Sequence, residues 1–182
     1  MSALAKKHLT EDLSDDGDDF SPSPPSAAEI EFDINVARVG GYLASIANRH
    51  EADDVGWVLD LAFRSFENLR PVFQLFGGIS GRQRDDLLAG LTTARVGVEL
   101  HGLDFDQNAC DEGLRAMQSL AVHYARPSGA EARISAGRID DLWDHVRIAK
   151  YAVGIAWHRH QISARADQRA IATLDLPMEI KS

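Results

Sequence analysis

The sequence predicts an all-α protein, an antiparallel bundle of about five helices behind a disordered acidic N-terminal tail. Three observations predict this fold. Apolar residues recur in alternating steps of three and four along five segments, Gly and Pro punctuate the ends of these segments, and Ser-x-x-Glu or Ser-x-x-Gln patterns precede several of them. No segment shows the strict alternation of apolar and polar residues that is typical of a half-buried strand.

Residues 1–25 form an acidic stretch that ends in Ser and Pro. Its charged residues are Lys6, Lys7, Glu11, Asp12, Asp15, Asp16, Asp18 and Asp19. The stretch has too little apolar surface to offset the entropy lost on ordering, so we expect a disordered tail. An alternative is a motif anchored by Leu13 and Phe20 that folds onto a basic partner. The expected organisation is therefore a tail over 1–25, a helical bundle over 26–174 and a C-terminal tail over 175–182.

The first helix is predicted to run from Ser26 to about His50. Ser26 and Glu29 have the spacing of a capping box, in which each side chain binds the other residue's backbone N–H. One face of the helix is apolar, with Phe32, Val36, Val39, Leu43 and Ile46. Gly40 and Gly41 each weaken a helix by about 1 kcal/mol relative to alanine, so we expect another backbone to approach closely there.

The second helix is predicted to begin at Asp53 and to end at Gly77 and Gly78. Its apolar face is rich in aromatic residues, with Val55, Leu59, Ala62, Phe66, Leu69, Phe73 and Phe76. Pro71 interrupts this pattern, because proline removes a helix hydrogen bond and clashes with the preceding turn. We expect either a kink just before Pro71 or a new helix that starts there.

A second capping box, Ser80 to Gln83, opens the third helix, which ends at His101 and Gly102. Its apolar face holds Leu87, Leu91, Ala94 and Val98. The fourth helix is predicted from Asp106 or Asn108 to just before Pro127, and its apolar face holds Cys110, Leu114, Met117, Ala121 and Tyr124. A third capping box, over residues 128–131, leads towards the last helix.

The fifth helix is predicted over residues 137–163, with a pattern that could continue to about residue 173. Its apolar face holds Ile139, Leu142, Val146, Ala149, Val153, Ala156 and His160. Trp143, Tyr151 and Trp157 lie off this face. A helix that is apolar on more than one side is either central in a core or part of an interface. Because aromatic residues dominate binding interfaces, these three are the predicted partner-binding residues.

Composition narrows the functional classes. A net charge of −9 and a pI near 5.2 disfavour nucleic-acid binding, which requires clustered Lys and Arg. Cys110 is the only cysteine, so one chain cannot form a disulfide or a thiolate zinc site. We find no secretory signal, no apolar run near the ~20 residues that span a bilayer, and no phosphate loop or dinucleotide fingerprint. We expect a cytoplasmic protein without cofactor or membrane contact.

Histidines are predicted to gather at one end of the bundle. Because sequential helices run antiparallel, the first, third and fifth helices point the same way, and His50, His101 and His160 close them. Asp104 belongs to a loop at the same end. These residues could bind a divalent metal or titrate near neutral pH. The alternative is that the histidines interact with helix C-termini and that the nearby acids cap the next helix.

Arg138 and His145 lie seven residues apart on the fifth helix and therefore share a face. Their spacing resembles the Arg-x(4–6)-His element of the HEPN ribonucleases, which are all-helical and usually dimerise. The resemblance implies action of this pair on an RNA 2′-hydroxyl and the scissile phosphate, chemistry that suits imidazole.

The absence of a stronger catalytic set, together with the charge and the off-face aromatics, favours a non-catalytic protein that binds another protein. We expect an adaptor, an inhibitor, or an antitoxin or immunity protein whose partner has a basic surface. A homodimer is a further expectation. The alternatives are the HEPN-like ribonuclease and a metal- or pH-responsive bundle.

Overall fold

The computed structural model describes residues 24–76, 78–101, 106–125 and 134–174 of the 182-residue chain. Within these ranges all regular elements are helices, and the only β contact is an isolated bridge between Ile79 and Ala125. The predicted all-α bundle is therefore confirmed. Most of the predicted N-terminal tail, the C-terminal tail, the capping box over 128–131, and the residues Gly102 and Asp104 lie outside the described ranges.

The five predicted helices correspond to α1 with the short helix η1, α2 with α3, α4, α5 and α6. Their bounds are α1 Ala27–Ser45, η1 Ile46–Asn48, α2 Ala52–Asn68, α3 Arg70–Leu75, α4 Gly81–His101, α5 Gln107–His123 and α6 Ala136–Leu174. The interruption expected at Pro71 takes the form of a new helix, because α2 ends at Asn68 and Pro71 lies in the first turn of α3.

Side-chain caps fix several helix starts, as the sequence predicts. The Ser26 hydroxyl accepts from the Glu29 backbone N–H, and a Glu29 carboxylate oxygen accepts from the Ser26 N–H at 2.7 Å. Ser80 and Gln83 form the same reciprocal pair at α4. The prediction for α2 is wrong, because Asp53 lies inside the helix and Glu51 takes the N-cap position without a side-chain cap.

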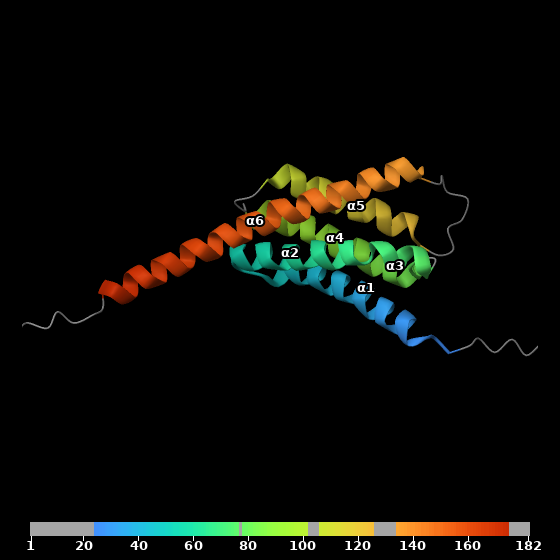
Figure 1. Cartoon of the computed structure of the whole chain (residues 1–182), viewed down its shortest axis with the longest axis horizontal. Coiled ribbons are helices and arrows are strands. Elements are labelled where there is room, and N and C mark those ends of the chain that lie inside the picture. Colours follow the sequence, from blue (N-terminus) through green and yellow to red (C-terminus); the bar gives the residue numbers. More distant parts are fainter. Residues whose placement is uncertain (1–23, 77, 102–105, 126–133, 175–182) are drawn as a thin grey trace, which may run out of the picture.

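The helices close into a ring (Figure 1). In this ring α1 contacts α2 and α4, α4 contacts α5, and α6 lies against both α5 and α2. Sequential helices run antiparallel, which their short connections favour. Helix α6 therefore closes the bundle by lying between α2 and α5.

The close approach expected at the glycine pair of α1 is present at one of the two residues. A Cβ built on Gly90 of α4 would lie 3.1 Å from the Gly40 carbonyl oxygen and 3.0 Å from the Leu43 Cβ. Gly41 faces outward, and a Cβ there would meet nothing within 4 Å. Gly40 and Gly90 together therefore let α1 and α4 pack closely.

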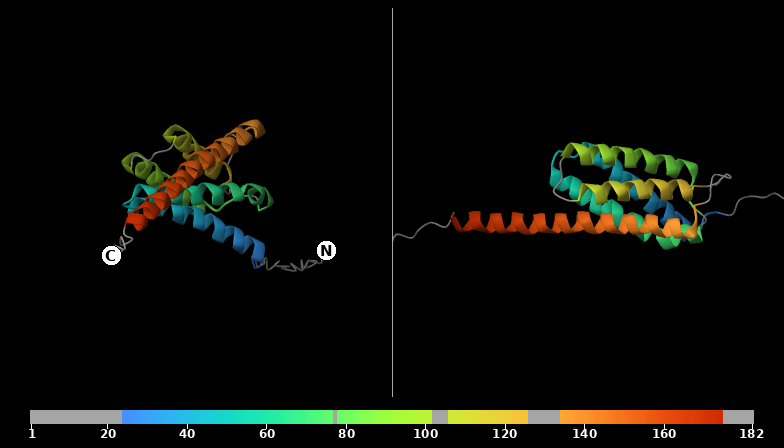
Figure 2. Two further views of the ribbon diagram at one scale, coloured as in Figure 1. Left: turned by 60° about the vertical axis from the view of Figure 1, so that its left-hand side comes forward. Right: turned by 90° about the horizontal axis from the view of Figure 1, so that it is seen from above.

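Helix α6 is longer than the bundle that it completes. Its 39 residues extend over ~60 Å, and its C-terminal part projects past the other helices (Figures 1 and 2). Val153 is the last described α6 residue that is fully buried, and the side chains over 158–169 are exposed or half-exposed. None of the described helices combines the length and apolar character required to cross a membrane.

Candidate functional site

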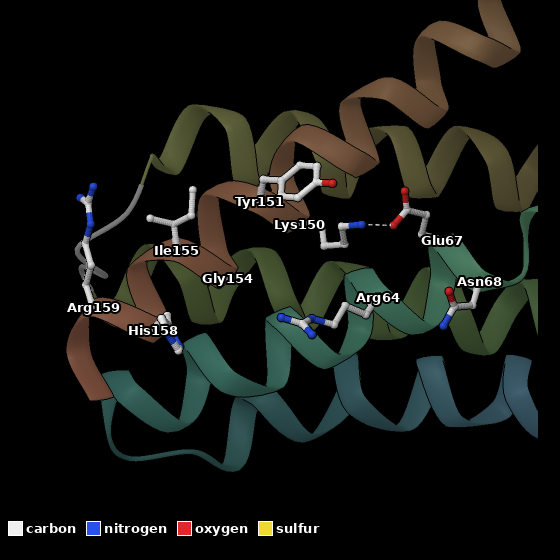
Figure 3. A pocket seen from close by; sticks show the side chains of 9 residues that line it. All are labelled: Arg64, Glu67, Asn68, Lys150, Tyr151, Gly154, Ile155, His158 and Arg159. Atoms are coloured by element: carbon white, nitrogen blue, oxygen red, sulfur yellow. Dashed lines mark hydrogen bonds and ion pairs between the residues drawn. The ribbon is translucent and has the colours of Figure 1, made fainter. Parts of the chain in front are cut away.

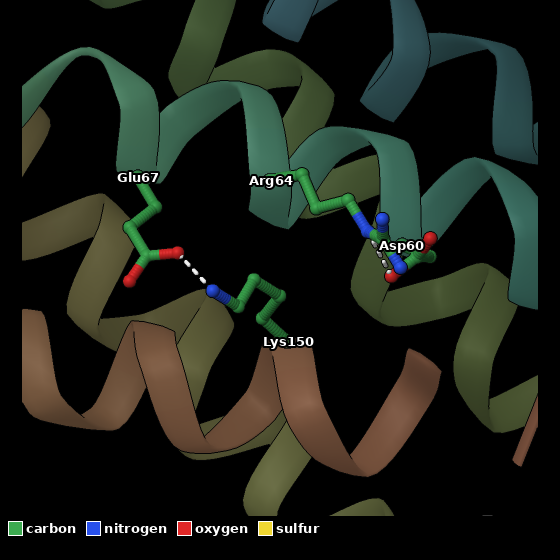
Figure 4. Close-up of polar contacts among 4 residues, drawn as sticks. All are labelled: Asp60, Arg64, Glu67 and Lys150. Carbon is green, nitrogen blue, oxygen red and sulfur yellow. Dashed lines mark hydrogen bonds and ion pairs between the residues drawn. The ribbon is translucent and has the colours of Figure 1, made fainter. Parts of the chain in front are cut away.

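One ion pair joins α2 to α6, and a second ion pair lies within α2 beside it (Figure 4). The Asp60 carboxylate on α2 is only 5% exposed, and its Oδ1 accepts from the Nε of Arg64 at 2.9 Å. Further along α2, Glu67 pairs with Lys150 of α6. Buried charge is tolerated when it is paired and hydrogen-bonded. These pairs therefore allow charged side chains to lie between two core helices.

A groove of about 680 Å³ lies beside these pairs, between α2 and α6 (Figure 3). Gly154 forms part of its wall. A Cβ on Gly154 would lie 3.0 Å from the Asp60 Oδ1, so the missing side chain lets α6 approach this carboxylate closely. Lys150 approaches the ring of Tyr151, with 4.7 Å between Nζ and the ring centroid. Arg64 and Arg159 add positive charge to the lining of the groove, which contrasts with the net charge of −9 of the chain.

The outward face of α6 carries a line of exposed side chains, which we name the outer row. Its members lie at three- and four-residue steps: Ile148, Tyr151, Ile155, His158 and Ile162. Three isoleucines at seven-residue intervals are a sequence signal for a second helix-packing face, and this signal was missed in the predictions above. Of the three predicted partner-binding residues, Tyr151 belongs to the outer row, and it also lines the groove.

The structure corrects the prediction for Trp143. This side chain is 1% exposed and packs against Phe66, Phe73 and Tyr124, with the Arg70 guanidinium 5.7 Å from its ring centroid. It cannot contact a partner of the folded chain. The reason is that α6 packs against α2 and α5 at once, so its buried arc is wider than a single apolar face.

Trp157 lies beyond the last fully buried residue of α6. Its side chain is half-exposed, and its ring lies 6.5 Å from that of His160. A surface role therefore stays a prediction for Trp157 and Tyr151 alone.

A second, smaller cavity lies between α5 and α6. Arg138 and His145 both line its volume of about 230 Å³, together with Glu112 and Arg115. Glu112 approaches His145, with 3.4 Å between Oε2 and Nδ1. The structure thus brings the two residues of the Arg-x6-His element to one cavity and adds a carboxylate that the sequence did not indicate.

The predicted histidine cluster does not form among the described residues. No group of three or more His, Cys, Asp or Glu side chains is placed to hold a metal there. His50 and His160 are exposed and His101 is half-exposed. Because α6 runs past the end of the bundle instead of stopping there, His160 lies on a helix surface that is open to solvent. Asp104, the fourth predicted ligand, is outside the described ranges.

Comparison of the chain with protein-family models, with characterised proteins and with solved structures gives no significant match. The functional conclusions therefore depend on the geometry of this chain alone.

Proposed function

We propose that this protein is a non-catalytic cytoplasmic regulator that acts by binding another polypeptide through the outer row of α6. The observation that carries the proposal is the exposure of Ile148, Tyr151, Ile155 and Ile162 on one helical face. Apolar residues at helical spacing, with charged residues beside them, are typical of a helix that docks against another protein. An adaptor, an inhibitor, or an antitoxin or immunity protein all fit this mode.

Charge along α6 refines the expected partner. Between Arg147 and Arg169 the only acidic residue is Asp167, so this half of the helix is basic although the whole chain is acidic. A partner that covers the C-terminal half of α6 should therefore carry acidic residues. The partner with a basic surface, expected from the net charge, would have to bind one of the acidic faces instead.

Two matched substitutions test the proposal. Ile155 on α6 and Val96 on α4 are both branched aliphatic residues that are 52% exposed. The wild-type chain, Ile155→Asp and Val96→Asp are immobilised and used to capture proteins from a lysate of the source cells. We expect at least one partner that wild type and Val96→Asp retain and Ile155→Asp loses. Equal capture by both variants, or no capture by any of the three, would refute the proposal.

The second candidate function is a ribonuclease that resembles the HEPN enzymes. It is supported by the shared cavity of Arg138 and His145 and by the contact between His145 and Glu112. A carboxylate beside an imidazole can orient it and stabilise its protonated form during proton transfer. The purified protein is incubated with RNA, and cleavage that His145→Ala abolishes would favour this candidate over the first.

A further inference from the structure

The outer row lies on the side of α6 opposite to its core contacts. Successive residues of an α-helix are rotated by about 100°, so residues two apart point in nearly opposite directions. Ile148 stands two residues after the buried Val146, and Ile155 two residues after the buried Val153. In the view from above, the bundle lies on one side of α6 along most of its length (Figure 2), and α3 reaches the N-terminal part of α6, where Arg70 pairs with Asp140. A second helix can therefore lie along the outer row without displacing any core contact.

Charged residues extend the outer row at both ends. Before Ile148 the same face carries Asp141 and Asp144, which we name the acidic flank. After Ile162 it carries Arg165 and Arg169, the basic flank. All four are exposed, and Asp144 also forms an ion pair with Arg147 of the same helix at 2.8 Å, an exposed pair that an incoming arginine can share. The face thus reads as acidic, apolar, then basic along the direction of the chain.

This order of charges is complementary to itself when the helix is reversed. Asp141 and Arg169 lie equally far from Ile155 along the helix, on either side, and so do Ile148 and Ile162. A second copy laid antiparallel, with a two-fold axis near Ile155, places each acidic flank beside the other copy's basic flank and isoleucines beside isoleucines. A parallel copy would place like charges together, which opposes association. A two-fold contact of identical surfaces is the commonest form of oligomer.

The projecting part of α6 gives a second reason for a partner. Residues 158–169 have no buried side chain in this structure. Helices of this length are marginal in water by themselves, because most helical stability in proteins comes from packing of an apolar face. In the antiparallel pair, the projecting end of each copy lies along the half of α6 that the other copy's bundle supports, and Ile162 gains an apolar neighbour.

We propose that two copies of this chain associate through antiparallel pairing of their α6 helices, centred near Ile155 and oriented by the acidic and basic flanks. This inference rests on the proposed function, because it identifies a second copy of the chain as a partner that binds the same outer row. Tyr151, Ile155 and His158 also line the groove between α2 and α6. A helix on the outer row would therefore border that groove, and self-association would compete with any other partner that uses this face.

Sedimentation equilibrium of the full chain, from about 1 to 200 µM, measures the association. Wild type and the control Val96→Asp should form dimers with the same dissociation constant. Ile155→Asp should raise that constant by at least ~30-fold, because it places a charge at the centre of the interface in both copies. Circular dichroism checks that each variant stays helical. A monomeric wild type at 200 µM would overturn the inference.

Charge reversal tests the orientation of the two helices. It also tests whether the α6 helices pair at all if Ile155→Asp loses helicity. Asp141→Arg with Asp144→Arg makes both flanks basic, whereas Arg165→Asp with Arg169→Asp makes both acidic. Each double variant alone should dissociate, an equimolar mixture of the two should associate, and the chain with all four changes should self-associate again. Double variants that dimerise as tightly as wild type would contradict antiparallel pairing, because reversing one flank in both copies leaves the charge pairing of a parallel dimer unfavourable in all these chains and changes it only in the antiparallel one.

The two proposals fail in different ways. A chain that stays monomeric but captures a different protein in an Ile155-dependent manner refutes the self-pairing and leaves the proposed function standing. A chain that dimerises through the outer row but captures no other protein supports the self-pairing and refutes the regulatory role.

Discussion

A methyl group added at Gly113 would collide with two neighbouring helices. A Cβ built on this residue of α5 would lie 2.3 Å from the Cβ of Ala149 on α6 and 3.0 Å from Cε1 of Phe63 on α2. The Ala149 Cβ is bonded directly to the backbone and cannot rotate away. Gly113→Ala therefore forces α5 and α6 apart by roughly 1 Å, until the two carbons reach a normal contact near 3.5 Å.

Two opposing effects set the size of the change in stability. Overpacking of a dense core costs about 1–3 kcal/mol, and alanine in a helix interior stabilises by about 0.5–1 kcal/mol relative to glycine. The cost of overpacking exceeds the gain in helix propensity, because α6 is already held between α2 and α5 and cannot move away freely. We expect Gly113→Ala to lower the free energy of unfolding by about 1–2 kcal/mol. Gly41→Ala, where the added carbon meets nothing within 4 Å, should instead raise it by about 0.5–1 kcal/mol.

Urea denaturation followed by circular dichroism and tryptophan fluorescence measures both changes. Removing the opposing methyl group tests the cause: the double variant Gly113→Ala with Ala149→Gly should show a coupling energy of about 1 kcal/mol or more in a double-mutant cycle. The reasoning is refuted if Gly113→Ala is as stable as wild type, or if Gly41→Ala destabilises the protein to the same extent.

Three further predictions follow from the structure. Burial, reinforced by the nearby carboxylates Asp111 and Asp106, raises the pKa of the Cys110 thiol from 9.0 to about 12. Above pH 9 the unfolded chain loses this proton more readily than the folded one, so the free energy of unfolding should fall by up to ~1.4 kcal/mol per pH unit towards pH 12. Cys110→Ala should remove that part of the pH dependence in urea titrations. Replacing Asp60 by alanine should lower the free energy of unfolding by about 1 kcal/mol or less in the same assay, because the exposed Arg64 guanidinium can bind water in place of its lost acceptor, and a loss above about 2 kcal/mol would contradict this. In dilute monomeric protein, amide hydrogen exchange over 158–169 should be at least ~10-fold faster than over 142–153, and equal rates would show that the projecting helix needs no partner.

The arrangement of helices was largely readable from the sequence because each helix buries one regular apolar face. The apolar periodicity predicts Phe66, Val146 and Val153 on such faces, and all three are buried. The start of α2 was placed wrongly at Asp53, because a residue of capping type is also acceptable inside the first turn, where negative charge is favourable. Local signals identify a helix more reliably than they identify its first residue.

The candidate site was less predictable, because exposure depends on where neighbouring helices end. Trp143 and Trp157 lie fourteen residues apart and on nearly the same side of α6. Trp143 is buried among the aromatic residues of the core, whereas Trp157 is half-exposed, since α6 continues past the rest of the bundle. The residues around each tryptophan do not show where the neighbouring helices end. The outer row had a visible signal in Ile148, Ile155 and Ile162, but its exposure became clear only in three dimensions.

The position of α6 between α2 and α5 has a consequence for biosynthesis. The pair formed by Glu67 and Lys150 joins residues 83 positions apart, and α6 leaves the ribosome after the other described helices. Until it emerges, the faces of α2 and α5 that it covers have no partner, and the aromatic side chains of α2 are open to solvent. Folding of this bundle should therefore wait until α6 has emerged, and a nascent chain stalled before residue 136 should be a substrate for chaperones.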